Sequence, residues 1–514
     1  MKKNAIIILL AIFGLQFTVA NTLQAQQSKP DARYKLIREQ YKVNRDGTTE
    51  YNYRKEITLL RNRAITAYAD KGETFIVYNP AFQHLTINEC YTIRKDGSKV
   101  TTPKRAFVEQ LPSACEDCGR FNGLIELAIV HTALEYDCTI VLDYTINSKC
   151  DILQRQIQLT QDCPVDKYEI VVDLPRDGKL YSHINDAGTD IKKVNDKHTL
   201  HLVATSLKQS LSERYLPSDI YPTVSFANVE SASGQMTQIK DNLPDAQYFI
   251  LNAKDKIKKS GNYTASERDQ MLITQLQNHV VENIHTNHLS PELQKYACAV
   301  PEEVWRSGCG TPYEKAQTLA ALLRQAGFYA YASLGETEFT TDDGHKFYLA
   351  NESQTTVSVV YGSDQLTLSA TDNRPHTSPA KFCPTHRDLE WTPENSDQTI
   401  YTYSLPAGDN PAGVNPAYLT AKRTAPVQTN ACDDQYTYTI HLGTKATLTN
   451  PTETAYDIDG LGSLKISIRQ NGENIEVTKY LKLEKSLIDE NHYQDFRRMM
   501  IDWNKCNTLY LKSK

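Results

Sequence analysis

The sequence predicts a multidomain α+β protein, with β-rich domains at both ends and an α/β unit between them. Three observations support this fold class. The chain has 514 residues, enough for about three domains of ordinary size. Hydrophobic residues make up 40% of it and charged residues 23%, which is typical of chains that bury folded cores. Alternating segments rich in tyrosine dominate both ends, whereas amphipathic helical periodicity appears in the middle.

The net charge of the chain indicates whether nucleic acid is an expected partner. The formal net charge is -6, so the chain offers no basic field that would draw it to nucleic acid. We expect no nucleic-acid partner. The sequence also has no phosphate-binding Gly-rich loop and no HExxH or GxSxG motif. We therefore expect no cofactor.

Residues 1–25 are predicted to be a signal peptide. Lys2 and Lys3 precede an almost wholly apolar run from Ala5 to Ala20, which is the pattern of a charged region followed by a hydrophobic one. Cleavage is expected after Ala20 or Ala25. The run is shorter than the about 20 residues of a spanning helix. We expect a periplasmic or secreted protein with no transmembrane segment after cleavage, in a compartment that permits disulfides.

An N-terminal antiparallel β-sandwich is predicted over residues 28–240. Asp-Gly pairs, which signal hairpin turns, recur between alternating segments at positions 46–47, 96–97 and 177–178. The clearest strands are residues 139–146 and 168–174. Strands without long intervening helices favour antiparallel pairing. The polar stretch 231–245 is interpreted as a linker.

A mixed α/β unit is predicted over residues 250–395. Ser266 and Asp269 are spaced like a helix N-cap and its partner. Apolar residues then recur every fourth position, at Leu272, Leu276, Val280 and Ile284, which indicates an amphipathic helix facing a core. A second helix is predicted to begin at Thr311, and strands are predicted over 355–361 and 365–369.

A small β-rich C-terminal domain is predicted over residues 430–514. The preceding stretch, 401–430, is rich in Pro, Ala and Asn and is interpreted as a connector. Asn471-Gly472 predicts a hairpin turn. The last helix carries an apolar stripe spaced three, four and three residues apart, which we interpret as core packing rather than a cofactor site. The residues of this stripe are Tyr493, Phe496, Met500 and Trp503.

Residues 308–330 read GCGTPYEKAQTLAALLRQAGFYA. This segment resembles the core of bacterial transglutaminase-like domains, which are papain-related cysteine catalysts. The matching residues are Ala316, Leu319, Ala-Leu-Leu-Arg at 321–324, Gly327 and Ala330. The whole chain also resembles a periplasmic architecture of Gram-negative bacteria. There, an uncharacterised β-rich domain precedes a transglutaminase-like core and a small β-rich C-terminal domain.

The resemblance implies nucleophilic chemistry, yet the residues for it are missing. In that family a Cys at the helix N-terminus is activated by a His, which an Asp orients. In this sequence Pro312 stands at the Cys position, Gln354 or Thr355 at the His position, and Ser369 at the Asp position. None of these is a thiol or a base near neutral pH. Residues 311–314 (TPYE) instead form a capping box that specifies the helix start. The sequence therefore predicts a degenerate active site in a pseudoenzyme.

A shifted site is the alternative. Cys309 lies three residues before Pro312, His345 precedes the predicted strands, and Asp372 follows the last of them. Together they would serve a cysteine-dependent peptidase or acyl transferase. Cys309, however, would lie in the loop before the helix, where most of the effect of the helix dipole is lost. Otherwise Cys309 is expected to be buried or disulfide-bonded.

The favoured interpretation is an exported, non-catalytic protein that binds a peptide, a glycan or a partner protein through the degenerate cleft. Trp305, Tyr313 and Tyr348 are the aromatic candidates for this cleft. No metal site is expected, because the CxxC pair at 115–118 lacks a second pair at zinc-finger spacing. In an oxidising compartment a local disulfide or a loop thiol is favoured there. Eleven cysteines leave the disulfide connectivity open.

Overall fold

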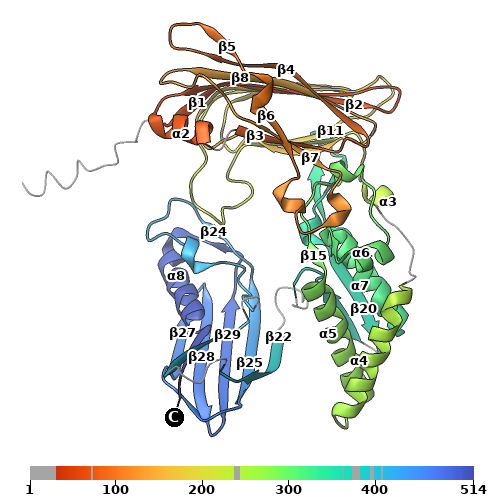
Figure 1. Cartoon of the computed structure of the whole chain (residues 1–514), viewed down its shortest axis with the longest axis vertical. Coiled ribbons are helices and arrows are strands. Elements are labelled where there is room, and N and C mark those ends of the chain that lie inside the picture. The colour runs from red at the N-terminus through yellow and green to blue at the C-terminus, as the bar shows by residue number, and fades with distance from the viewer. Residues whose placement is uncertain are drawn as a thin grey trace, which may run out of the picture.

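The structure is a computed structural model. It describes residues 30–70, 73–236, 243–362, 364–372, 383–393, 399–406 and 409–513. The predicted signal peptide, 1–25, lies outside the described residues, as does part of the predicted linker at 231–245. Three groups of elements follow one another along the chain, with the β-rich N-terminal group lying across the ends of the other two (Figure 1).

The N-terminal group is an eight-stranded sheet with two three-stranded sheets packed on it. The strand order of the large sheet is β12-β13-β10-β1-β2-β8-β4-β5, and those of the small sheets are β11-β14-β9 and β3-β7-β6. The strands of the large sheet are β1 (Ala32–Val43), β2 (Thr49–Leu59), β4 (Gln83–Ile93), β5 (Lys99–Thr101), β8 (Thr139–Ser148), β10 (Val165–Asp173), β12 (Ile191–Asn195) and β13 (Thr199–Leu207). The others are β3 (Glu73–Tyr78), β6 (Phe107–Gln110), β7 (Ile125–Ile129), β9 (Gln154–Gln158), β11 (Tyr181–Asn185) and β14 (Thr223–Ala227), with helices α2 (Asn62–Asp70) and α3 (Ser233–Met236).

Alternation along the strands separates the two faces of the large sheet. Ile140, Leu142 and Tyr144 of β8 share one face and pack into the cores beneath the small sheets. On the other face Arg54 pairs with the neighbouring carboxylate of Asp143 at 3.3 Å. The prediction of a wholly antiparallel sandwich was wrong in one respect, because β1 pairs with β10 in parallel. Hairpin turns signal only pairing between strands that follow each other, so a pairing between distant strands leaves no local trace.

The central group has four helices that share one core with a three-stranded sheet of order β17-β20-β21. Helix α5 begins after Thr264, whose side chain forms a capping box with Glu267, and not after Ser266 as predicted. The predicted apolar stripe is confirmed, since Leu272, Leu276 and Val280 are buried. The helices are α4 (Gln247–Ser260), α5 (Ala265–Asn283), α6 (Pro301–Ser307) and α7 (Pro312–Ala326). The strands are β15 (His285–Thr286), β16 (Cys309–Gly310), β17 (Tyr329–Ser333), β18 (Glu336–Thr340), β19 (Lys346–Ala350), β20 (Thr356–Tyr361) and β21 (Asp364–Leu368).

The C-terminal group is a five-stranded sheet of order β22-β25-β29-β28-β27, covered by helix α8 (Glu490–Lys505). The predicted stripe on α8 is core packing, since all four of its residues are buried. Gly472 has a φ of 63° at the hairpin turn, a conformation that favours glycine. The strands are β22 (Cys383–Trp391), β23 (Ile400–Ser404), β24 (Val427–Gln428), β25 (Cys432–Leu442), β26 (Ala446–Leu448), β27 (Thr452–Ile458), β28 (Gly462–Asn471), β29 (Asn474–Leu483), β30 (Leu487–Ile488) and β31 (Thr508–Ser513).

Two features of this group differ from the sequence interpretation. Strand β22 falls within the predicted central unit, 250–395, but pairs in parallel with β25 of the C-terminal sheet. The stretch 401–430 is not an open connector, because Leu405, Val414 and Val427 are buried in the C-terminal core. This stretch is also tied to the N-terminal group, since Glu213 and Arg423 form an ion pair at 3.5 Å. Polar and small residues predicted an exposed segment, but the apolar residues between them are buried in the core.

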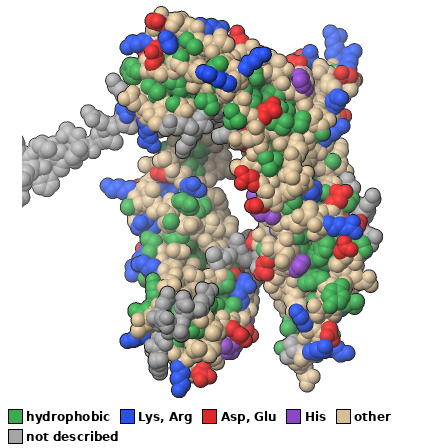
Figure 2. Space-filling model, viewed as in Figure 1, with side chains coloured by type: hydrophobic (Ala, Val, Ile, Leu, Met, Phe, Trp, Pro, Cys, Tyr) green, Lys and Arg blue, Asp and Glu red, His purple; other side chains and the backbone are tan. Residues whose placement is uncertain are grey.

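No helix within the described ranges is long and apolar enough to cross a membrane. Acidic and basic side chains are interspersed over the face shown in Figure 2, without a continuous basic field.

Candidate functional site

The start of helix α7 is the centre of the candidate site. Thr311 precedes the helix and its hydroxyl accepts the Glu314 N–H, while the Glu314 carboxylate accepts the Thr311 N–H at 2.9 Å. The capping box predicted from the sequence is thus confirmed. Thr311, Pro312, Tyr313 and Glu314 are all buried, so the helix start lies inside the protein. A buried helix start must find partners for its N–H groups within the chain.

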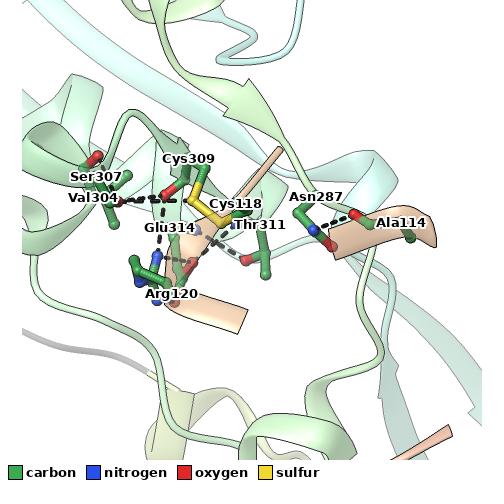
Figure 3. Close-up of a disulfide and its surroundings, with 9 residues drawn as sticks. All are labelled: Ala114, Cys118, Arg120, Asn287, Val304, Ser307, Cys309, Thr311 and Glu314. Carbon is green, nitrogen blue, oxygen red and sulfur yellow. Dashed lines mark hydrogen bonds and ion pairs between the residues drawn. A yellow bond between two sulfur atoms is a disulfide. The ribbon is translucent and has the colours of Figure 1, made fainter. Parts of the chain in front are cut away.

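A loop of the N-terminal group also contacts this helix start (Figure 3). Arg120 donates to both carboxylate oxygens of Glu314, at 2.8 and 3.0 Å, and to the Cys309 carbonyl at 3.1 Å. The Glu314 carboxylate also accepts the Ala299 N–H at 2.7 Å. A bidentate arginine–carboxylate pair is strong and geometrically specific. It therefore fixes the N-terminal group against the start of α7.

A disulfide reinforces the same junction. Cys118 is bonded to Cys309, with the two Cα atoms 5.7 Å apart, and both side chains are buried. The prediction of a disulfide is confirmed, although it does not close the CxxC pair, because Cys118 bonds to Cys309 while Cys115 is a buried thiol. In this state Cys309 has no thiol that could act as a nucleophile.

The structure places the four residues that the sequence analysis aligned with the catalytic positions of transglutaminase-like domains. Pro312 is the first residue of α7. The 3₁₀ turn η6 (Glu352–Gln354) lies against the helix start, because the Tyr313 N–H donates to a Glu352 carboxylate oxygen at 3.2 Å. Thr355 follows this turn, and its hydroxyl accepts the Gly335 N–H at 3.2 Å. Gln354 is exposed.

Ser369 lies at the same end of the sheet. Val357 of β20 pairs with Leu368 of β21, so Thr355 and Ser369 flank the end of this strand pair. The Ser369 hydroxyl accepts the N–H groups of Thr371 and Asp372, at 3.1 and 3.2 Å. Ser369 therefore closes a turn after β21. Thr355 and Ser369 thus lie at one end of the β20–β21 pair, and the turn Glu352–Gln354 lies against the start of α7. None of the side chains of Pro312, Gln354, Thr355 and Ser369 is a base.

Glu352 is the residue that the sequence analysis missed. One of its carboxylate oxygens accepts the Tyr313 N–H, and the other is buried without a hydrogen-bond partner. Burial raises the pKa of Glu352 to about 7. The Glu352 carboxyl group therefore occupies the place at the start of helix α7 where the helix dipole would stabilise the thiolate of a cysteine catalyst. Its position depends on the path of the loop after β19, which no sequence motif signals.

The shifted candidates are not brought together by any contact among the described residues. His345 is exposed in the turn between β18 and β19, and its ring lies 3.6 Å from Asp343. Its backbone N–H donates to Thr341. Asp372 lies in the turn after β21, where its carbonyl accepts from Gln277 at 3.1 Å. Cys309 is bonded to Cys118 on the other side of the helix start.

The aromatic candidates lie in three different surroundings. Trp305 packs beside His279 and Phe249, with ring centroids 4.9 and 6.1 Å apart. Tyr313 is buried in a small apolar cluster around Cys298. The Tyr348 hydroxyl donates to Glu338 at 3.2 Å on the β18–β19 hairpin. They do not form one aromatic cleft.

Two cavities lie between the N-terminal and central groups. The smaller, about 270 Å³, is next to Glu352, since its lining includes Asn351, Ala350 and Leu349. Strand β9 contributes Gln154, Arg155 and Gln156 to the opposite wall. The larger, about 840 Å³, lies between residues 176–198 and the tip of the β18–β19 hairpin, which includes His345. Within the described ranges, no cluster of three or more His, Cys, Asp or Glu residues is arranged to hold a metal ion.

Two regions of the chain match models of known domain families. Residues 45–209 match a domain of unknown function with a solved structure, DUF3857, and residues 398–509 match another such domain, DUF3858. The second match includes the stretch 401–430, in agreement with its burial in the C-terminal core. No curated protein matches the sequence.

Among solved structures, the chain is similar to that of a "putative protease" from Parabacteroides distasonis ATCC 8503. The two share 23% identity with a TM-score of 0.63, over 94% of this chain and 99% of that one. Two further matches have TM-scores too low to indicate a shared overall fold. The native yeast LTA4 hydrolase has a TM-score of 0.20 at 10% identity, over 51% and 39% of the chains. The periplasmic domain of TgpA from Pseudomonas aeruginosa has a TM-score of 0.19 at 13% identity, over 60% and 91%. The chain therefore shares the overall fold of the Parabacteroides protein and carries DUF3857 and DUF3858 domains on either side of its central unit.

Proposed function

We propose that this is an exported, non-catalytic transglutaminase-like protein that binds a peptide, a glycan or a partner protein at the junction of its N-terminal and central units. The observation that carries the proposal is the start of helix α7. It begins with Pro312, and the Tyr313 N–H is occupied by the chain's own Glu352. In a cysteine catalyst that place is needed for the thiolate.

Three further features support the absence of catalysis. Cys309 is held in a disulfide, so it lacks a nucleophilic thiol. The positions of the family's base and its orienting acid hold Gln354 or Thr355 and Ser369, none of which can accept a proton near neutral pH.

Export is supported by the charged and apolar pattern of residues 1–25 and by the disulfide, which is stable in an oxidising compartment.

The cavity beside Glu352 is the proposed binding site. Its lining includes the polar residues Gln154, Gln156 and Asn351. Polar groups of this kind suit the amides of an extended peptide or the amide-bearing sugars of a cell-wall glycan. Probes are labelled decapeptides and labelled muropeptides, tested by fluorescence anisotropy. Binding that is lost in Asn351→Trp, which fills the cavity, supports this site. Absence of binding by every probe, or equal binding by the variant, would refute it.

A cysteine-dependent hydrolase or acyl transferase is the second candidate. It is favoured by the shared fold with a structure described as a "putative protease", although 23% identity shows fold alone. This candidate requires Cys309 to act as a thiol. Amine incorporation into casein and hydrolysis of a peptide library would be measured with the oxidised and the reduced protein, with Cys309→Ser as control. We expect no activity in any of the three. Activity of the reduced wild type that Cys309→Ser lacks would replace the binding proposal with the enzyme.

A further inference from the structure

Three cysteines from two parts of the chain share one buried cluster. Cys115 and Cys118 belong to the N-terminal group, and Cys309 belongs to the central unit. All three have side chains with at most 1% exposure. Apolar residues surround them and exclude water, namely Phe121, Leu124 and Leu289. The cluster holds one disulfide, Cys118–Cys309, and one thiol, that of Cys115.

The local backbone holds Cys115 next to the bond. The 3₁₀ turn η2 (Ser113–Cys115) leads directly to Cys118, whose N–H donates to the Cys115 carbonyl at 3.0 Å. This places the two cysteines on consecutive turns of one tight loop. The spacing Cys-x-x-Cys is one in which two cysteines readily join in a disulfide.

Asn287 holds this loop against the strand that carries Cys309. Its side-chain amide donates to the carbonyl of Ala114, the residue before Cys115, at 2.6 Å. Its backbone N–H donates to the Gly310 carbonyl at 2.9 Å, one residue after Cys309. A single residue thus connects the neighbours of the thiol with the neighbours of the disulfide (Figure 3).

We propose that Cys115, Cys118 and Cys309 form an intramolecular thiol–disulfide exchange site, which converts the bond between the two units into a local bond within the CxxC loop. The Cys115 thiolate attacks the Cys118 sulfur, so the Cys115–Cys118 bond forms as the Cys118–Cys309 bond breaks. Cys309 leaves as a thiolate and takes up the proton that Cys115 lost. One disulfide is exchanged for another, so no external oxidant or reductant is consumed.

The exchange has two structural consequences. It removes the covalent link between the N-terminal group and the central unit, leaving noncovalent contacts at this junction, among them the Arg120–Glu314 ion pair and the Asn287–Ala114 hydrogen bond. It also restores a thiol at Cys309, three residues before Pro312, the first residue of helix α7, with the Ser307 hydroxyl 3.8 Å from its sulfur. Burial raises the pKa of Cys115, so we expect slow exchange near neutral pH and faster exchange in alkaline solution.

The chain offers a direct mass-mapping test. Trypsin releases residues 106–120, which contain both Cys115 and Cys118, and residues 307–315, which contain Cys309. The purified full chain would be held without reductant at neutral pH and at about pH 9, where a larger fraction of each thiol is ionised. It would then be quenched in acid, denatured and alkylated. Before exchange, peptide 106–120 carries one label and is linked to 307–315. After exchange, peptide 106–120 carries an unlabelled internal disulfide, and 307–315 is free and labelled.

Matched variants make the test decisive. We expect labelling of Cys309 to be at least about tenfold higher in the wild type than in Cys115→Ser, which lacks the attacking thiol. Retention of the link between 106–120 and 307–315 in Cys115→Ser shows that this variant folds. Cys298→Ser, which removes another buried thiol, is expected to exchange like the wild type. Equal labelling of Cys309 in Cys115→Ser, labelling of Cys118 in place of Cys309, or no labelling of Cys309 at either pH would overturn the proposal.

Discussion

Arg120 and Glu314, 194 positions apart in the sequence, form a bidentate ion pair that joins the N-terminal group to the start of helix α7. The Glu314 side chain is 0% exposed and that of Arg120 is 18% exposed. The same carboxylate closes the capping box with Thr311. One buried acid therefore couples the start of a helix to the placement of a neighbouring domain.

The first prediction concerns this pair. Arg120→Leu leaves the Glu314 carboxylate buried without its counter-charge, and removing one partner of a buried pair costs about 3–5 kcal/mol. We expect the free energy of unfolding to fall by about that amount, measured by urea denaturation followed by circular dichroism.

An exposed ion pair serves as the control. Arg33 and Asp166 lie 2.7 Å apart with both side chains 45% exposed, so Arg33→Leu is expected to cost less than about 1 kcal/mol. If the two variants lose the same stability, the Arg120–Glu314 pair does not hold the junction in the way described.

The second prediction concerns Glu352 and pH. Its pKa is raised by burial from 4.5 to about 7 in the folded protein. Between these values the folded state keeps a proton that the unfolded state has lost, so stability falls as pH rises from about 4.5 to 7. The shift corresponds to roughly 3 kcal/mol at most. We expect Glu352→Gln, which stays neutral, to lose this dependence.

Urea unfolding of both proteins at several pH values between 5 and 8 measures the effect. The stability of Glu352→Gln relative to wild type is expected to increase up to about pH 7 and to level off above it. A difference between the two proteins that stays constant with pH would show that Glu352 ionises normally in the folded state.

Sequence patterns predicted the elements whose signals are local. The capping box at Thr311 and Glu314 and the Asn471-Gly472 turn each depend on residues within one turn of each other, so the sequence specifies them directly. The apolar stripe of α8 is equally local, because one helix face carries it.

Contacts between distant segments carried no such signal. The parallel pairing of β1 with β10 and of β22 with β25 depends on the path of the whole chain. The bond of Cys118 to Cys309 likewise spans 191 positions. Glu352 was missed for the same reason, because its role depends on how η6 meets the start of α7. The candidate site is built mainly from these distant contacts. The sequence therefore predicted helix α7 but not the residues that contact its start.

The third prediction concerns a buried lysine in the C-terminal domain. Lys479 is 1% exposed and donates to the Trp503 carbonyl at 2.9 Å. Burial lowers its pKa from 10.5 to about 7. From pH 7 to 10 the unfolded state keeps a proton that the folded state lacks, so stability rises with pH by up to roughly 5 kcal/mol. At pH 6 both states are charged, and the charge is buried at a cost.

Lys479→Met removes that charge. We expect the variant to exceed the wild type in stability at pH 6, and the difference to shrink towards pH 10, as measured by urea unfolding. Lys465→Met, at an exposed position on β28, serves as the control and is expected to show no such trend. A Lys479→Met variant that is less stable than the wild type at pH 6 would mean that the hydrogen bonds of the ammonium group outweigh its burial.

The fourth prediction concerns the stretch 401–430. Besides its ion pair with Arg423, Glu213 accepts the Thr424 N–H at 2.7 Å and the Ala425 N–H at 3.2 Å. The side chains of Arg423 and Glu213 are 2% and 11% exposed. Trypsin must therefore break these contacts before it cleaves after Arg423.

Loss of a buried partner costs about 1–3 kcal/mol, and each 1.4 kcal/mol is about tenfold in an equilibrium constant. We expect Glu213→Ala to accelerate cleavage after Arg423 by about tenfold or more, because proteolysis follows local opening. Glu453→Ala, which breaks an exposed ion pair with Arg469, is expected to leave that rate unchanged. If the wild type is cleaved after Arg423 as fast as Glu213→Ala, the stretch 401–430 is an open connector, as its composition suggested.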